Sequence, residues 1–374
     1  MAAADPDLER DLAALRELAG TFCAKELVPN QDRWIAEHRV DRELWHLAGD
    51  IGLLGLSVPT EYGGGGGTVA HEAVLIEEQA DVGDTCWGVS AHEVVANYVL
   101  AHGTPDQRAR WLPGLATGRL VGAIAITEPD AGSDVRAVAT RAVRDGEDYR
   151  VTGSKSFVTN GSLADLVVML VRTGEELSLL VVEAGDDGPV RGRPARKLGR
   201  NGQDTAELFF DGLRVPAANV LGGAEGRGLA QLLPMISLER LLIAVAAVST
   251  MDSVLAQAVR YTRQRVVYGR PLFRSQHVRF TLAGCATEAA VTRAFVERCV
   301  HRQAAGELGM TEAAMAKLSA TERLGRVVDE CLQLFGGYGY LDEFPIARAW
   351  ADARITRIYG GANEVMKEII SGSL

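Results

Sequence analysis

Hydrophobic residues recur with different periods along the 374-residue chain, and the changes of period divide it into three segments. In residues 1–118, Leu8, Leu12 and Leu15 follow the spacing of a helix that buries one face. The same spacing returns later in this segment, beyond a glycine-only loop at Gly63–Gly67. We therefore expect residues 1–118 to form a helical domain.

In residues 119–225 the apolar positions form short runs bounded by charged or glycine-containing turns. No stretch with helical periodicity separates these runs, which argues against alternating strands and helices. The pattern predicts a middle domain built on an antiparallel β-sheet or barrel. The expected strands are 121–126, 165–171, 177–182 and 206–210.

Helical spacing returns in residues 226–374 and continues to the end of the chain. The expected fold class is therefore α+β, in the order helical, β, helical. Pro271 separates the first two helices of the last segment. The expected helices are 232 to about 265, 276–301, 311–335 and 363–370.

Charge and composition exclude several classes of function. Lys and Arg number 39 and Asp and Glu 49, so the formal charge of −10 opposes general attraction to nucleic acid or anionic lipid. The longest strongly apolar run, 241–248, is far shorter than the ~18 residues of a membrane span. Five scattered cysteines predict neither a disulfide framework nor a metal site. The N-terminus lacks a signal-peptide pattern, and we expect a cytoplasmic protein without bound metal.

Two polar loops of the middle segment are candidate ligand contacts. The first, Thr-Glu-Pro-Asp-Ala-Gly-Ser-Asp from Thr127 to Asp134, offers the hydroxyls of Thr127 and Ser133 to a flat ligand with anionic parts. An ordinary polar turn explains these residues equally well. In the second loop, Phe157 could stack on a ring system and Thr159 could donate to it. A strand end followed by an Asn–Gly turn is the simpler interpretation there.

Glu239 is the single residue whose sequence neighbours most clearly suggest a catalytic role. Its neighbours three and four residues away on a helix are all apolar, namely Met235, Ile236, Leu242 and Ile243. A carboxyl group on such a face is desolvated, and its pKa rises toward the range useful to a general base. A structural ion pair with an arginine is the competing explanation.

Two glycine pairs interrupt the C-terminal helices. Gly360 and Gly361 leave backbone N–H groups bare before the last helix, which makes either an oxyanion or phosphate site or a flexible turn. Gly336 and Gly337 end an earlier helix and permit close approach of a ligand or another chain. A plain glycine helix cap is the alternative for this second pair.

Taken in order, the segments resemble the acyl-CoA dehydrogenase family over nearly the whole chain. The resemblance rests on the loop 127–134, on Thr-Asn-Gly at 159–161 and on Arg-Ile-Tyr-Gly-Gly-Ala-Asn-Glu-Val-Met-Lys at 357–367. The stretches 203–210 and 238–243 are most similar to the long-chain and isovaleryl-type branch. The family implies an N-terminal helical domain (1–118), a middle antiparallel β domain (119–225) and a C-terminal four-helix bundle (226–374), assembled as a homotetramer.

The resemblance also implies FAD bound between the middle domain and the bundle. Thr127 and Ser133 would contact the flavin and the cofactor phosphate, Phe157 would pack on the isoalloxazine, and Thr159 would bond near N5. The residues implied to bind FAD are Thr127, Ser133, Phe157, Thr159, Tyr268 and Asn363 and, toward a neighbouring subunit's FAD, Arg265, Gln276, Gln333 and Gly337. Those implied to lie at the substrate are Ser133, Arg240, Tyr359 and Gly360.

One position departs from the usual family pattern. Most members carry the catalytic Glu directly after the Tyr of the last motif, where this chain has Gly360. The long-chain and isovaleryl branches place it on the long helix before an Arg, and Glu239–Arg240 matches that arrangement. At Ala362 the family often has a Thr that touches the cofactor, so one FAD contact is weakened here.

The implied reaction is the conversion of an acyl thioester to its trans-2-enoyl thioester. Glu239 would remove the α-proton, flavin N5 would accept the β-hydrogen as hydride, and the N–H of Gly360 would polarise the thioester carbonyl. An electron-transferring flavoprotein or another acceptor would reoxidise the flavin. The same motifs leave open a dehydrogenase of carrier-protein-bound acyl or aminoacyl thioesters, an acyl-CoA oxidase, and a non-catalytic flavin- or acyl-binding homologue. Neither the length nor the branching of the acyl chain follows from the sequence.

Overall fold

The N-terminal part of the molecule is helical. The computed structural model describes residues 6–185 and 188–374. Thr68 and Thr104 accept hydrogen bonds from the first turns of two helices and so begin them. The glycines 63–67 form the predicted loop, which hydrogen-bonds back to residues 55–58. The helices are α1 (Pro6–Phe22), α2 (Gln31–Glu37), α3 (Arg42–Asp50), α4 (Val69–Asp81), α5 (Val89–His102) and α6 (Pro105–Ala116).

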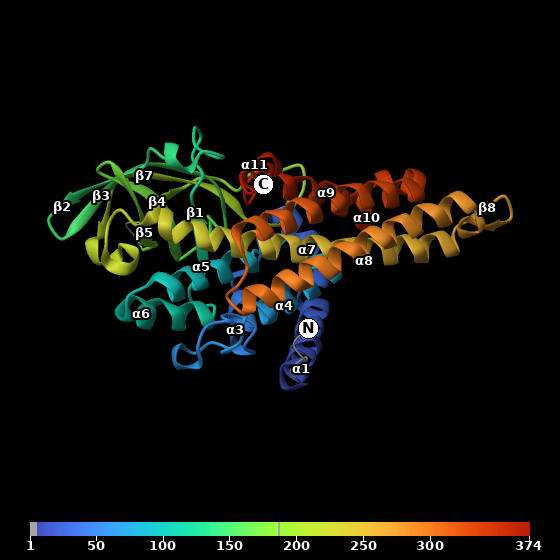
Figure 1. Ribbon diagram of the computed structural model, residues 1–374, viewed down its shortest axis with the longest axis horizontal. Helices are drawn as coiled ribbons and strands as arrows, with labels where there is room; N and C mark the ends of the chain where they lie inside the picture. The colour runs from blue at the N-terminus through green and yellow to red at the C-terminus, as the bar shows by residue number, and fades with distance from the viewer. Residues whose placement is uncertain (1–5, 186–187) are drawn as a thin grey trace.

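The middle part is a twisted sheet that covers one end of the helices (Figure 1). Its path runs β1-β4-β2-β3-β7-β6, and β5 pairs with β4. Its strands are β1 (Gly122–Ala125), β2 (Arg141–Asp145), β3 (Asp148–Thr159), β4 (Leu166–Thr173), β5 (Glu176–Glu183), β6 (Val190–Arg191) and β7 (Thr205–Pro216).

The predicted antiparallel sheet is correct for most strand pairs and wrong for two partners of β4, because β2 (Arg141 opposite Arg172) and β1 both pair with β4 in parallel. Antiparallel pairing joins β2 to β3, β3 to β7, β6 to β7 and β4 to β5. In contrast, β1 pairs with β4 in parallel, from Gly122 opposite Leu166 to Ala125 opposite Met169. The β2–β3 hairpin lies between them in the chain and lets β4 return in the direction of β1. Apolar runs record burial but not strand direction, so the sequence could not reveal this pairing.

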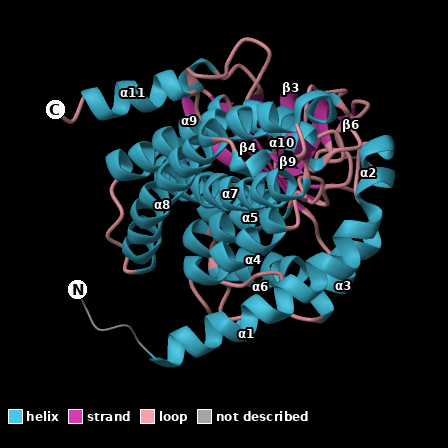
Figure 2. Cartoon of the chain, turned by 90° about the vertical axis from the view of Figure 1, so that its right-hand side faces the viewer, coloured by secondary structure: helices cyan, strands magenta, loops and turns pink. Residues whose placement is uncertain are grey.

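The C-terminal part is a helical bundle around α7, which begins at Gly228 rather than at the predicted 232. Figure 2 shows α7 near the centre, with α8, α9 and α10 beside it. The expected helix 363–370 is confirmed as α11, and α10, which was not expected, also packs on α9. The helices are α7 (Gly228–Gln264), α8 (Gln276–Ala304), α9 (Met310–Phe335), α10 (Pro345–Ala353) and α11 (Asn363–Ser371).

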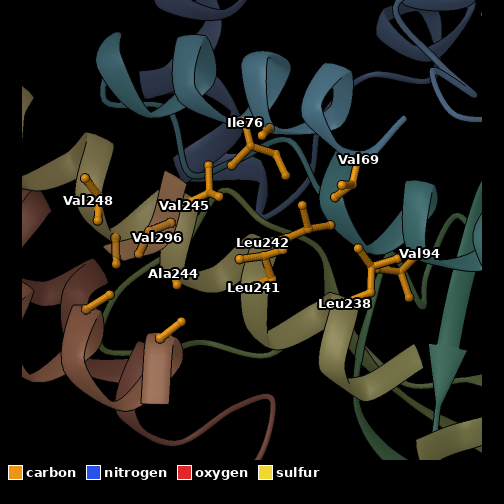
Figure 3. Close-up of a cluster of buried hydrophobic side chains, with 14 of the residues drawn as sticks. Val69, Ile76, Val94, Leu238, Leu241, Leu242, Ala244, Val245, Val248 and Val296 are labelled. Atoms are coloured by element: carbon orange, nitrogen blue, oxygen red, sulfur yellow. The ribbon is translucent and has the colours of Figure 1, made fainter. Parts of the chain in front are cut away.

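One hydrophobic core joins all three parts. Figure 3 shows Val69 and Ile76 of α4 and Val94 of α5 facing Leu238 and Leu242 of α7. Strands β4 and β5 add side chains to the same cluster, and α8 and α9 close it from the other side. Because α7 contacts every layer, a side chain on α7 can meet residues from the N-terminal helices, the sheet and the bundle.

Among residues 6–185 and 188–374, α7 is the one helix long and apolar enough to cross a membrane by length and composition. In its most apolar window, 61% of the residues are buried inside the protein. Core helices of soluble proteins pass the same test, so this is weak evidence for a membrane span.

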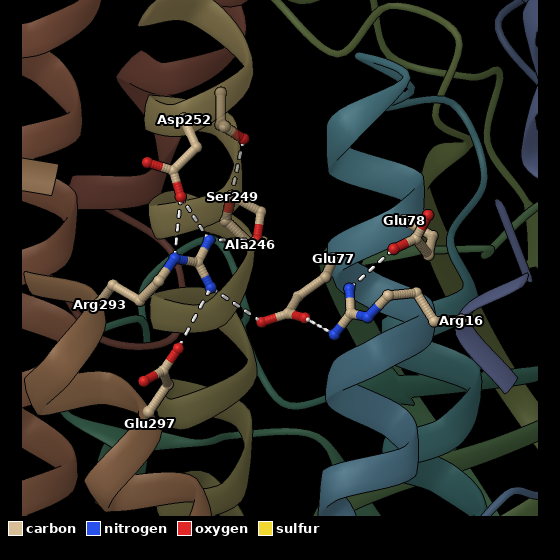
Figure 4. Close-up of polar contacts among 9 residues, drawn as sticks. Arg16, Glu77, Glu78, Ala246, Ser249, Asp252, Arg293 and Glu297 are labelled. Atoms are coloured by element: carbon tan, nitrogen blue, oxygen red, sulfur yellow. Dashed lines mark hydrogen bonds and ion pairs between the residues drawn. The ribbon is translucent and has the colours of Figure 1, made fainter. Parts of the chain in front are cut away.

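An ion-pair network ties the N-terminal helix to the bundle (Figure 4). Arg16 of α1 contacts Glu78 at 2.8 Å and Glu77 at 2.6 Å on α4. Glu77 also meets Arg293 of α8 at 3.2 Å, and Arg293 pairs with Asp252 of α7 at 2.6 Å. Single surface pairs contribute little, but a network that shares Glu77 orients four helices at once.

Candidate active site

Glu239 lies on α7 where the bundle meets α5 of the N-terminal domain. The hydroxyl of Tyr98 on α5 donates to Oε1 of Glu239 at 3.3 Å. Burial of the carboxyl group raises the pKa of Glu239 to about 7, against the opposing effects of the Tyr98 hydrogen bond and the nearby charge of Arg240. The apolar face expected from the sequence therefore exists. A carboxyl group that titrates near neutral pH can accept a proton efficiently in a reaction.

The loop at Gly360 lies directly against α7 beside Glu239. Nε of Arg240 donates to the carbonyl of Gly360 at 3.3 Å, and Arg240 is buried at 6% exposure. Gly360 has φ of +63°, and a Cβ there would stand 2.4 Å from Cδ1 of Ile243, one turn beyond Glu239. A side chain at this position would have to displace the end of Ile243 and to adopt a backbone conformation that L-residues rarely take. The 360 loop nevertheless meets α7 just beyond Glu239 in the sequence, at Arg240 and at Ile243.

Lys317 on α9 holds the 360 loop and was missed by the sequence reasoning. It is fully buried, and its Nζ donates at 2.8 Å both to the carbonyl of Gly361 and to Oδ1 of Asn363. Burial and the charge of Arg240 lower the pKa of Lys317 to about 8. The sequence did indicate that Lys317 is buried, because it lies among Ala313, Ala316 and Ala320, which α9 buries.

Two residues expected near cofactor or substrate have other contacts. Asn363, expected to bind FAD, is 3% exposed, and its amide is engaged with Lys317 and Thr321. It therefore helps hold the loop. The ring of Tyr359 lies 5.5 Å from the guanidinium of Arg200. Within the described ranges the N–H of Gly360 has no hydrogen-bond acceptor, so it is free to bind a ligand.

The two polar loops of the middle domain lie side by side. The N–H of Ser156 donates to the carbonyl of Thr127 at 2.8 Å. The register of β3 shifts between Lys155 and Val158, and Phe157 sits in this bulge with φ of +58° and 74% exposure. Positive φ is strained for an aromatic residue, and exposed strain of this kind marks ligand contacts. The structure thus brings Thr127 and Phe157 together, with Thr159 at the end of the same strand.

A buried ion pair underlies both loops. Nζ of Lys155, which is fully buried, contacts Oε1 of Glu128 at 2.7 Å and also donates to the carbonyls of Ile126 and Leu170. The N–H groups of residues 139 and 140 donate to the Glu128 carboxylate. Burial lowers the pKa of Lys155 to about 8, although Glu128 opposes this shift. The sequence reasoning identified neither residue as the support of these loops.

The other group of expected FAD residues lies at the far end of the bundle. A cavity of about 760 Å³ there is lined by Arg265, Gln333 and Gly337, and Tyr268 beside it is 98% exposed. At 1.5 Å of rise per residue, Arg265 lies roughly 39 Å along α7 from Glu239. No single dinucleotide cofactor spans that distance together with the flavin loops. Within one chain, the two groups therefore belong to different sites. Gln276 begins α8 next to the same cavity.

A second cavity, of about 370 Å³, opens on the face of α7 that carries Glu239. Ala246, Thr250 and Gln257 line it, and they lie about two, three and five helical turns beyond Glu239 on the same face. Trp87, which could have shortened an acyl pocket, is 1% exposed and packs against Phe22 and other aromatic rings of the N-terminal core. It does not narrow this cavity.

Comparison with known proteins agrees with this architecture. Models of the N-terminal, middle and C-terminal domains of acyl-CoA dehydrogenase match residues 9–119, 123–213 and 226–374. The long-chain specific acyl-CoA dehydrogenase of mouse mitochondria is 42% identical over 364 residues, covering 95% of this chain and 84% of that protein. An acyl-CoA dehydrogenase from Geobacillus kaustophilus superposes with a TM-score of 0.94 at 39% identity, covering 100% of this chain and 99% of that one. The chain belongs to the acyl-CoA dehydrogenase family.

The family is FAD-dependent, and the residues present fit that cofactor. A glutaryl-CoA dehydrogenase from Mycobacterium smegmatis, solved in complex with FADH2, superposes with a TM-score of 0.91 at 28% identity over 99% of this chain and 95% of that one. In this chain the exposed ring of Phe157 and the adjoining polar loop offer a flat face with hydrogen-bond donors. The protein is thus an FAD-dependent enzyme that dehydrogenates acyl-CoA.

Proposed function

We propose that Glu239 is the base that removes the α-proton of the acyl-CoA. The observation that carries the proposal is the desolvated carboxyl group of Glu239, which accepts from Tyr98 and stands next to Arg240, whose Nε donates to the carbonyl of Gly360. Burial makes the carboxylate a stronger base than an exposed one, and a pKa of about 7 keeps it substantially ionised at neutral pH. Gly360 itself carries no side chain that could do this.

The thioester carbonyl needs a donor, because the α-proton of a thioester is only weakly acidic. The unpaired N–H of Gly360 serves this purpose, and Lys317 fixes the next carbonyl of the loop. Thr127, Ser133, Phe157 and Thr159 are the residues of this chain that would hold FAD at the middle domain. When bound, FAD supplies the hydride acceptor, N5, for the β-hydrogen.

The favoured substrate class is long, straight-chain acyl-CoA. The cavity along α7 begins two helical turns beyond Glu239; small residues such as Ala246 line its α7 side, and charged residues such as Asp84 and Arg348 line other walls. Each CH2 group buried there contributes about 0.8 kcal/mol to binding. A branched acyl group is wider near its thioester end. Ile243, which lies beside the Gly360 loop, disfavours that extra width.

Anaerobic titration of the flavin absorbance tests the substrate. Palmitoyl-CoA and dodecanoyl-CoA are expected to bleach the oxidised flavin, with butyryl-CoA and isovaleryl-CoA bleaching it only weakly. Ala246→Leu should slow bleaching by palmitoyl-CoA and leave the butyryl-CoA response unchanged, because Ala246 lies roughly 10 Å along α7 from Glu239, beyond the reach of a four-carbon chain. If no CoA ester bleaches a protein that holds FAD, the substrate is a carrier-protein-bound thioester. Peroxide release in air without another acceptor would identify an oxidase.

Assembly as a homotetramer is proposed from the two separate groups of FAD residues. Arg265 of one subunit would complete the cofactor site of its neighbour, since it lies far from the flavin loops of its own chain. Arg265→Ala is expected to lose FAD, and Glu239→Gln to keep FAD without turnover. Hybrids refolded from a mixture of both variants should regain activity, because some sites then combine an intact Glu239 with a neighbour's Arg265. Hybrid formation without recovered activity would disprove the shared site.

The electron acceptor and the location are also proposals. We expect an electron-transferring flavoprotein to reoxidise the reduced enzyme, which a coupled reoxidation assay measures directly. A cytoplasmic location fits the five cysteines, which are all free and buried. Recovery of the protein in a membrane or secreted fraction would contradict it.

A further inference from the structure

Tyr98 is a buried side chain that the reaction as described does not use. It lies on α5 and is fully shielded from solvent, yet its hydroxyl reaches across to α7 and donates to Oε1 of Glu239 at 3.3 Å. Figure 3 shows the packing of this contact region, where Val94, one turn before Tyr98, faces Leu238. A buried tyrosine hydroxyl needs a hydrogen-bond partner, and across the described part of the chain this one has only Glu239.

The hydrogen bond places the two carboxylate oxygens of Glu239 in different surroundings. Oε1 accepts from Tyr98, whereas the described residues offer no donor to Oε2. Arg240, the neighbouring cation, directs its Nε to the carbonyl of Gly360 instead. Oε2 is thus the carboxylate oxygen that accepts no hydrogen bond from the described residues.

We propose that Tyr98 is a positioning residue for the base: its hydroxyl holds Oε1, so that the ionised carboxylate presents Oε2 to the α-carbon of the acyl-CoA. The proposal rests on the assignment of Glu239 as the base. It gives the N-terminal domain a part in the chemistry, because α5 carries the group that orients a side chain of the bundle.

The charged and titratable groups around Glu239 support this assignment. From α5, His102 lies against the ring of Tyr98, but its Nε2 is occupied by the carbonyl of Gln231. From α7, Arg240 favours the ionised carboxylate, and from α9, Lys317 lies close enough to Arg240 for the Arg240 charge to lower the pKa of Lys317. Tyr98 is therefore the one group in the described ranges that donates a hydrogen bond to Glu239. The bond lowers the pKa of Glu239 and so limits the rise that burial causes.

Tyr98→Phe removes the hydroxyl and keeps the ring that fills the core. Without the donor, the ionised form of Glu239 is less stable and its pKa rises. The midpoint of the acidic limb of the pH profile for flavin reduction should move up by about one pH unit, the size expected for a hydrogen bond to a charged group. The rate at pH 7 should then fall roughly 3- to 10-fold and recover above pH 9. Stopped-flow bleaching by palmitoyl-CoA under anaerobic conditions measures both effects.

Tyr149→Phe is the matched control. Tyr149 is also buried, at 2% exposure, and its hydroxyl also donates to a glutamate, Glu225, but in the middle domain away from the base. This variant should leave the pH profile unchanged. A Tyr98→Phe profile that coincides with wild type would overturn the proposal. If Glu239→Gln kept its turnover, the base itself would be wrong, which is a separate failure.

A second measurement covers the case in which Tyr98→Phe does not hold flavin. Replacing Tyr98 with 3-fluorotyrosine keeps the hydroxyl and makes it a stronger donor. The acidic limb should then move to lower pH, opposite to the direction expected for Tyr98→Phe. No movement, or movement to higher pH, in a flavin-loaded protein would also overturn the proposal.

Discussion

Glu239→Gln is expected to retain FAD and to lose about 10²- to 10⁴-fold in the rate of flavin reduction, the range that a positioned general base supplies. The side chain is nearly isosteric and can still meet the Tyr98 hydroxyl, so the packing of α5 against α7 should survive. The flavin loops of the middle domain involve other residues, so the yellow colour should persist. Single-turnover bleaching by a saturating long-chain acyl-CoA isolates this step from reoxidation.

Glu225→Gln provides the control for this variant, because Glu225 also accepts from a buried tyrosine but lies outside the site. Its rate should equal that of wild type. Glu239→Gln should also be more stable than wild type at pH 8. The folded pKa of Glu239 lies above the unfolded value, so ionisation at high pH costs the folded state at most about 3 kcal/mol. This stability advantage should vanish as the pH falls below the pKa of Glu239 in the unfolded chain. A near-normal rate in Glu239→Gln would mean that another group takes the proton.

Glu128→Ala is expected to lower the free energy of unfolding by about 3–5 kcal/mol and to lose FAD, because it leaves the buried cation of Lys155 unpaired. It also removes the acceptor for the N–H groups of Ala139 and Thr140. The loops that carry Thr127 and Phe157 depend on the same anchor. Urea unfolding measures the stability, and the flavin-to-protein absorbance ratio measures the cofactor.

The double variant Glu128→Ala/Lys155→Met separates charge from geometry. Removing both charges should recover much of the stability, since no uncompensated ion stays in the core. FAD binding should stay weak, because the methionine cannot bond to the carbonyls of Ile126 and Leu170. If Glu128→Ala alone changed the free energy of unfolding by less than about 1 kcal/mol, as a surface substitution does, the Glu128–Lys155 pair would not support the loops.

The sequence predicted what depends on local pattern. Helical spacing located the long helix of the bundle, and the apolar neighbours of Glu239 predicted that desolvation raises the pKa of its carboxyl group, as it does in the fold. Helix α10, the nine residues Pro345–Ala353, was not predicted. The parallel pairing of β1 was missed because strand direction leaves no trace in burial.

The supporting residues of the site could not be predicted in the same way. Lys155 and Lys317 each contact groups far away in the sequence, such as Leu170 and Gly361. Only folding brings these partners together, and a single lysine within an apolar pattern carries no record of its partner. The family resemblance did name Asn363, but its amide bonds to Thr321 and Lys317 in the fold.

The parallel pairing of β1 with β4 also bears on the order in which the molecule folds. The β2–β3 hairpin closes between neighbours such as Asp145 and Asp148, whereas Gly122 must find Leu166 across the whole hairpin. Closing that long loop costs more entropy and is the slower event. On the ribosome, β1 has no partner until residue 173 has emerged. The hairpin should therefore exist before the flavin loops do, and the newly made chain should become able to capture its cofactor only late in folding.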